Sequence, residues 1–224
     1  MPRLSSQSGF SLIEMIVSLA LFSVVATISV GALLVLIASN QQLQTEQSIM
    51  TNLSFALDSM TREIRTGTNY YCSSRNNAAS GPQNRRIFED GRTLDSDVVG
   101  DCADGRNPAG AQYHGIAFVE GGQSITGAVD TKIVYFYDAD PDGDASTADG
   151  SLFRRVSGED AQAIVSSGIE ISDAQFYVTS SERLEDGDDF QPLVTIYVEA
   201  KDPTDPTGKI YKIQTTVTQR ILDL

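Results

Sequence analysis

The sequence FSLIEMIVSLALFSVVATISVGALLVLIA, residues 10–38, decides the fold of this chain. These 29 residues include one charged side chain, Glu14, and no proline. A helix needs about 20 apolar residues to cross the hydrocarbon core of a bilayer. The apolar core of a secretory signal peptide is shorter, about 7–15 residues. The stretch therefore predicts a transmembrane helix over residues 10–38.

The segment before this span is short and carries a positive charge. It reads MPRLSSQSG, residues 1–9, and Arg3 is its only charged side chain. Positive flanks stay on the cytoplasmic side of a membrane. The sequence therefore predicts a single-pass protein of the bacterial cytoplasmic (inner) membrane, with a cytoplasmic N-terminus and an exported C-terminal domain.

The helix is expected to continue beyond the membrane, from Phe10 to about Thr66. Residues 40–66 contain no proline or glycine, and Gly67 then supplies a stop signal. A stripe of apolar residues recurs in this part at helical spacing: Leu43, Met50, Leu53, Leu57, Met60 and Ile64. Residues 39–67 are thus predicted to form an amphipathic helix. Its stripe packs either on the protein's own sheet or, as the alternative, in a dimeric coiled coil.

Residues 68–224 are predicted to form a β-rich globular domain, so the fold class is α+β. Strands are expected at residues 115–120, 131–138, 151–156, 169–179, 192–200 and 209–221, where β-branched and aromatic residues gather. Both faces of the strand at 192–200 are largely apolar, which favours a central position, whereas the last strand alternates as if one face were covered. The polar stretch 68–111 is expected to be a long loop.

The net charge of −14 argues against nucleic acid as a partner. Nucleic-acid binding requires a basic surface, and no Lys/Arg cluster in this chain exceeds a pair. No enzyme is expected either, because the chain lacks a phosphate-binding glycine loop, a zinc-ligand spacing and a Ser/His/Asp set. The single histidine, His114, is expected at the surface or in a turn.

Glu14 is the unusual residue of the apolar span. A carboxylate at the membrane centre costs roughly 2.5–3.5 kcal/mol, and less near an edge. Glu14 lies near the start of the span, so it could be an interfacial side chain that reaches water. Its context is more specific, since Gly9-Phe10-Ser11-Leu12-Ile13-Glu14 opens the apolar run directly after the basic leader.

This string resembles the type IV prepilin signature, which type II secretion pseudopilins share. The resemblance implies that residues 1–9 are a leader, that a prepilin peptidase cleaves between Gly9 and Phe10, and that Phe10 is then N-methylated. It also implies that Glu14 pairs with the terminal amine of a neighbouring subunit. Partners would be other pilins or pseudopilins, through the N-terminal helix, and the peptidase/methyltransferase. Gly31 stands where many major pilins have a helix-kinking proline.

Looser patterns resemble one branch of this family, the J-type minor pseudopilins and their pilus relatives. They are NLSFALDSMTREIR at residues 52–65, the pair IVYFYD and GSLFRRV, and the late pair PLVTIYVEA and IYKIQTTVTQRI. The resemblance implies a minor pilin or pseudopilin that initiates or caps assembly of a type IV pilus or a type II secretion pseudopilus, and so serves protein secretion or pilus formation. Two alternatives stay open: a pilus-tip adhesin or ligand-binding module, and a membrane-anchored binding protein that does not polymerise.

Two further features concern the exported domain. Cys72 and Cys102 are expected to form a disulfide in an oxidising compartment, with two free thiols as the alternative. The acidic segment DADPDGDASTAD, residues 138–149, has the spacing of a calcium loop, with Asp138, Asp140, Asp142, Asp144 and Asp149 as candidate ligands. Its alternative is a solvated hairpin turn. No cofactor is required, and calcium is the one candidate.

Overall fold

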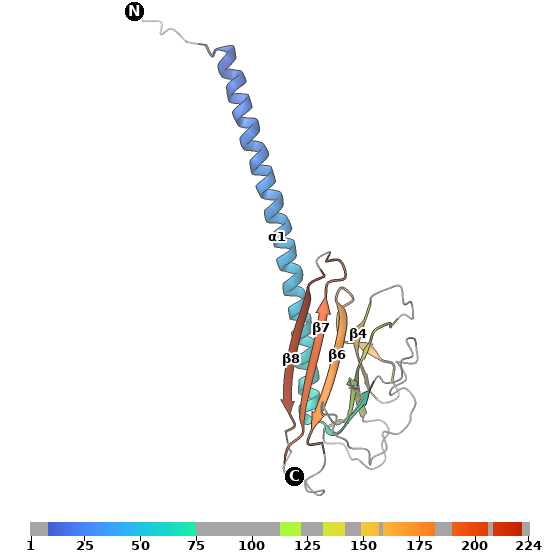
Figure 1. Ribbon diagram of the computed structural model, residues 1–224. Helices are drawn as coiled ribbons and strands as arrows, with labels where there is room; N and C mark the ends of the chain where they lie inside the picture. The colour runs from blue at the N-terminus through green and yellow to red at the C-terminus, as the bar shows by residue number, and fades with distance from the viewer. Residues whose placement is uncertain are drawn as a thin grey trace, which may run out of the picture. The chain divides into compact units, whose positions relative to one another are not determined.

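The computed structural model describes residues 9–74, 113–121, 132–141, 149–156, 159–181, 190–205 and 208–220. The chain divides into two compact units, Met1–Gln47 and Ser48–Leu224, and each is described here by itself. The boundary falls inside one helix. Figure 1 shows this helix, α1, and the strands of the second unit.

Helix α1 spans Leu12–Thr66, which confirms the expected long helix with a start two residues later. It contains no proline and only one glycine, Gly31, through which the helix continues without a break. The absence of a helix-breaking residue explains its length.

The part of α1 in the second unit buries one face. The buried residues recur at helical spacing, with Ala56 and Leu57 adjacent and the other steps three or four: Ile49, Leu53, Ala56, Leu57, Met60 and Ile64. The predicted stripe is therefore correct from Leu53 onward but wrong at its start. Met50 is 43% exposed because a step of 100° per residue turns it away from the stripe that Ile49 joins. Leu43, in the first unit, is 52% exposed.

Five strands form the first antiparallel sheet, in the order β1-β2-β3-β4-β5. Their bounds are β1 Thr68–Ser74, β2 Tyr113–Val119, β3 Lys132–Asp138, β4 Ser151–Val156 and β5 Gln162–Ala163. Strand β1 corrects the prediction of an unbroken loop over residues 68–111. Its sequence TNYYCSS has strand-forming residues but no alternation, and its pairing with the distant β2 stabilises it.

The second antiparallel sheet has the order β6-β7-β8, with β6 at Glu170–Thr179, β7 at Leu193–Lys201 and β8 at Ile210–Thr218. Strand β7 is central, as its sequence predicts. In β8, alternate residues face inward, with Val217 fully buried, so the prediction of one covered face is also confirmed. Both sheets are antiparallel, and the α+β fold class expected from the sequence is confirmed (Figure 1).

A single main core joins the buried face of the helix to both sheets. The helix contributes residues such as Leu53 and Met60, the first sheet contributes Phe118 and Tyr135, and the second contributes Phe176. The sequence left open whether the apolar stripe packs on the protein's own sheet or in a coiled coil. Within the second unit, the stripe packs on the protein's own sheets.

The C-terminal end of α1 is held by contacts from distant residues. The Tyr70 hydroxyl donates to the carbonyl oxygens of Ile64 at 2.6 Å and Gly67 at 2.7 Å. The backbone N–H of Arg220 donates to the Arg65 carbonyl at 2.8 Å. A Cβ at Gly67 would lie 2.3 Å from the Phe118 ring, so only glycine fits there. The carbonyls of Ile64 and Arg65, in the last turn of the helix, are thus bonded by residues outside it.

A half-buried ion pair ties the helix to the first sheet. Arg154 on β4 donates to both carboxylate oxygens of Glu63, with Nε–Oε2 and Nη2–Oε1 distances of 3.0 Å. The Tyr135 hydroxyl donates to Glu63 Oε2 at 2.7 Å. Burial, and then the adjacent Glu63 carboxylate, raise the pKa of Tyr135, so it stays a protonated donor. The hydrogen bonds to Glu63 likewise raise the pKa of Arg154.

We expect Glu63→Gln to lower the free energy of unfolding by about 1–3 kcal/mol, because the amide keeps only one acceptor oxygen and the Arg154 guanidinium loses its counter-ion. The matched control on the same helix is Asp58→Asn, which removes an exposed ion pair with Arg62 at 3.4 Å. That control should cost less than about 0.5 kcal/mol. Urea unfolding of the full chain in detergent, followed by tyrosine circular dichroism, measures both. Equal effects of the two variants would contradict the anchoring role of Glu63.

Candidate functional site

The first turn of α1 brings together the residues of the N-terminal signature. The Met15 N–H donates to the Ser11 carbonyl at 3.2 Å, so Ser11 is the N-cap and Glu14 is the third helical residue. Ser11 and Glu14 therefore have the spacing of a capping box, and Glu14 lies at the positive end of the helix dipole. Both effects favour a carboxylate at this position. Gly9 and Phe10 directly precede the helix, and Phe10 is 81% exposed.

The helix of the first unit exposes nearly all of its apolar surface. From Phe10 to Ile37, no Val, Leu, Ile, Met or Phe side chain is less than 45% exposed. Monomeric soluble proteins rarely expose an apolar surface of this extent, and such surfaces mark membrane or protein contacts. Within the described part of the chain, α1 is a helix long and apolar enough to cross a membrane.

Several hydroxyl groups inside the span find acceptors within the helix itself. Ser23 Oγ donates to the Leu19 carbonyl at 2.8 Å, Thr27 Oγ1 to Ser23 at 2.7 Å, and Ser29 Oγ to Val25 at 2.8 Å. Such bonds satisfy the hydroxyls where no water is present. Glu14 is then the one side chain of residues 10–38 whose charge needs a partner from outside the helix.

The comparisons with known proteins bear on the same residues. Residues 4–30 match the family model of the prokaryotic N-terminal methylation motif. The match includes Gly9, Phe10 and Glu14 and supports the prepilin-type family for this chain. Searches of the curated proteins and of the solved structures each returned no significant match. Together with the apolar helix, the motif supports anchoring in the inner membrane and a structural role.

The two cysteines lie mostly outside the described residues. Cys72 is in β1, with its Cα opposite Ile116 of β2, but its side chain and the whole of Cys102 are not described. The disulfide between them stays a prediction.

The acidic segment is described only at its two ends. Asp138 ends β3 and is 2% exposed, and its Oδ1 accepts the backbone N–H of Asp140 at 3.1 Å. Asp149 precedes β4, whereas Asp142 and Asp144 lie outside the described residues. Among the described side chains no group of three His, Cys, Asp or Glu is placed to hold a metal. Calcium binding by this segment stays a prediction.

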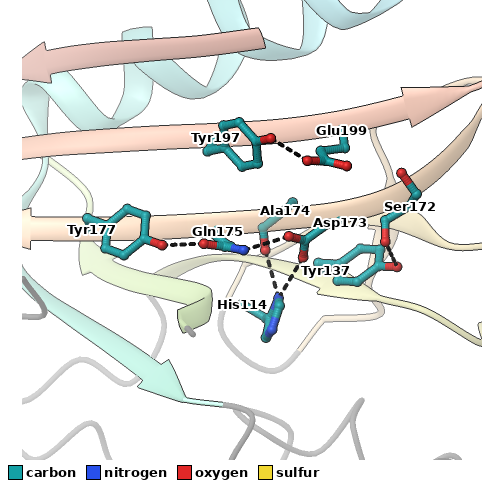
Figure 2. Close-up of polar contacts among 9 residues, drawn as sticks. All are labelled: His114, Tyr137, Ser172, Asp173, Ala174, Gln175, Tyr177, Tyr197 and Glu199. Atoms are coloured by element: carbon teal, nitrogen blue, oxygen red, sulfur yellow. Dashed lines mark hydrogen bonds and ion pairs between the residues drawn. The ribbon is translucent and has the colours of Figure 1, made fainter. Parts of the chain in front are cut away.

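His114 is buried, which corrects the expectation of a surface or turn position. It lies in β2 and is 4% exposed. Its Nδ1 is 2.8 Å from the carbonyl oxygen of Ala174, to which it donates, and 3.4 Å from Asp173 Oδ1 (Figure 2). The prediction failed because these partners are 60 residues away in the sequence. Nothing near His114 in the chain signals them.

Together with Tyr137, His114 covers an edge of the second sheet. The Tyr137 hydroxyl, from β3, donates to the Ser172 carbonyl at 2.9 Å (Figure 2). Ser172 lies at a register shift between Ile171 and Asp173, which bends β6 away from regular pairing. Strand β6 is an edge strand of the second sheet, and side chains of the first sheet bond to carbonyls on the side of β6 that faces away from β7.

We expect His114→Phe to lower the free energy of unfolding by about 1–3 kcal/mol, because the Ala174 carbonyl loses its donor inside the protein. Tyr137→Phe, which removes only the hydroxyl, should lower it in the same direction by a smaller amount. Urea unfolding of the full chain in detergent measures both. Wild-type stability in His114→Phe would show that the contact with β6 does not contribute.

Proposed function

We propose that this chain is a minor pilin or pseudopilin that is processed, N-methylated and assembled into a type IV pilus or a type II secretion pseudopilus. The observation that carries the proposal is the position of Glu14. It is the single charge of the exposed apolar span at residues 10–38, it lies in the first helical turn, and it falls within the N-terminal methylation motif. A helix that served only as an anchor would have no need of this carboxylate.

In this proposal, processing creates a partner for Glu14. Cleavage after Gly9 leaves Phe10 with a new α-amine, which is a cation at the edge of an apolar layer. Glu14 is an anion in the same layer. Each charge is costly when it is desolvated alone, and pairing between subunits offsets part of both costs. The pair forms only when neighbouring helices have the correct stagger, so it selects the register of assembly.

The apolar surface of the helix has two successive environments in this proposal. Before assembly, the lipid of the inner membrane covers it, with the N-terminus cytoplasmic and the second unit exported. After assembly, the apolar helices of other pilins or pseudopilins replace the lipid. Both environments are dry, which suits a helix in which the hydroxyls of Ser23, Thr27 and Ser29 are bonded internally.

We further propose a J-type minor subunit, which would initiate or cap the assembly. The sequence patterns behind this assignment fall on elements that build the core of the second unit: the packed half of α1, the β3–β4 pair and the β7–β8 pair. A subunit at the end of a filament contacts neighbours on fewer sides than a subunit in the shaft. The contacts that it does make must then be more specific.

The first test concerns processing. Gly9→Val should block cleavage, because a branched side chain replaces the small residue before the proposed scissile bond. Mass spectrometry of the protein from native membranes should find residues 1–9 retained in the variant and removed from the wild type. An N-methylated Phe10 terminus in the variant would overturn the assignment of the cleavage site.

The second test concerns assembly. Glu14→Gln should insert into the membrane at least as well as the wild type, since a neutral amide is cheaper to bury than a carboxylate. Its incorporation should fall by roughly tenfold without complete loss, because the neighbour's amine loses its counter-ion. The matched control is Glu46→Gln, the next acidic residue along α1. The measurement is co-purification with other pilins after mild crosslinking at matched expression. Normal incorporation of Glu14→Gln would rule out this docking role.

A further inference from the structure

A shallow depression lies on one face of α1, beside Glu14. It is lined by Ile13, Glu14, Val17, Ser18 and Leu21. These residues recur at steps of three and four, so they share one face of the helix near its start. The apolar side chains among them are all exposed. The depression is therefore open to a contact from outside the chain.

The small side chain of Ser18 creates the depression. Ser18 Oγ donates to the Met15 carbonyl at 3.0 Å, so the hydroxyl folds back against its own helix. The larger apolar side chains that line the depression project beside it. The result is an apolar depression with one carboxylate, that of Glu14, at its border.

Charge limits what can occupy this depression. The chain has no Lys or Arg between Arg3 and Arg62, so the apolar span supplies no counter-ion to Glu14. A carboxylate in an apolar layer requires a cation beside it. Because the carboxylate and the apolar lining adjoin each other, the occupant must carry a positive charge directly next to an apolar group.

The N-terminal residue that cleavage after Gly9 would create has this chemistry. Its α-amine and its benzyl side chain are attached to the same carbon atom. In a lysine the charge lies at the end of a long flexible stem, and in a lipid with an amine headgroup it lies outside the hydrocarbon layer. Both place the cation away from the apolar part, whereas a processed phenylalanine places the two together.

The chain's own N-terminus does not reach the far end of the depression. Val17 and Leu21 lie seven and eleven residues after Phe10 on the same chain. At 1.5 Å per helical residue, these positions are about 10 and 16 Å further along the axis. A phenylalanine side chain does not span that distance. The occupant must therefore come from another subunit.

We propose that this depression receives the N-terminal phenylalanine of a neighbouring subunit, with its ring over Ser18, beside Val17 and Leu21, and its amine at Glu14. This inference rests on the proposed function, because only a processed neighbour presents such a residue. It assigns docking to one face of α1, on which Ser18 leaves room for the ring. The neighbour's first residue then lies level with Glu14 to Ser18, a shift of roughly 6–12 Å along the helix axis.

A diazirine amino acid in place of Leu21 of the otherwise unchanged full chain tests where the neighbour's N-terminus lies. Leu19 is the matched control, because it has a similar depth in the span but lies about 200° away around the axis. Irradiation of native membranes should join position 21, but not position 19, to the first peptide of a neighbouring subunit, as mapped by mass spectrometry. Equal yields from both positions, or adducts of position 21 that never include an N-terminal residue, would overturn the proposal.

Filling the depression tests the same contact without a label. Ser18→Phe places a ring there, and Ser23→Phe is the matched control. Ser23 Oγ is likewise bonded to its own helix, at the Leu19 carbonyl, but the residue lies about 140° around the axis from Ser18. Co-purification with neighbouring subunits after mild crosslinking should fall about tenfold with Ser18→Phe and stay near the wild-type level with Ser23→Phe. Wild-type incorporation of Ser18→Phe would contradict the proposal.

The outcomes separate this inference from the proposed function. If Glu14→Gln reduces incorporation but Ser18→Phe does not, and position 21 captures no N-terminal residue, the proposal for the depression fails and the filament role stands. If neither substitution reduces incorporation, both fail. If Ser18→Phe prevents removal of residues 1–9, the photocrosslinking result decides, because the diazirine analogue keeps the size of leucine.

Discussion

The desolvation of a single carboxylate is the constraint on which the account of this protein depends. Glu14 lies in the first turn of a helix whose apolar side chains are all exposed up to Ile37. Capping geometry and the helix dipole favour a negative charge there, but neither supplies a counter-ion. Whatever covers the helix must therefore also meet this charge. In the proposed assembly, the terminal amine of a neighbouring subunit in the same layer would do so, and this need would link membrane insertion to assembly.

The second unit gives the helix a fixed point of attachment. Its C-terminal carbonyls are bonded by Tyr70 and Arg220, Gly67 allows the close approach of Phe118, and Glu63 joins the first sheet through Arg154 and Tyr135. These contacts make the packed half of α1 part of the core. In the proposed assembly, forces that act on this half of α1 would thus reach both sheets.

The sequence predicts the helix, six of the strands and the central place of β7, because each follows from local periodicity or composition. It does not predict β1, whose stability comes from pairing with β2, or the short β5. The burial of His114 and the pairing of Glu63 with Arg154 depend on residues 60 and 91 positions away. The N-terminal signature can be recognised from the sequence because Gly9, Phe10 and Glu14 lie close together in the chain. For the acidic segment and the cysteines the sequence offers only residue type and spacing. Calcium binding and the disulfide therefore stay predictions.

The central claim is that Glu14 of one subunit meets the terminal amine of another, and a zero-length carbodiimide crosslink tests it most directly. The reagent joins a carboxylate to an amine only when they are in contact. Applied to native membranes or isolated filaments, it should give a peptide in which Glu14 is linked to the amino terminus of a neighbouring subunit, absent from Glu14→Gln. If the terminal amine instead stays unreacted, or joins only residues of its own chain, the account of assembly is contradicted.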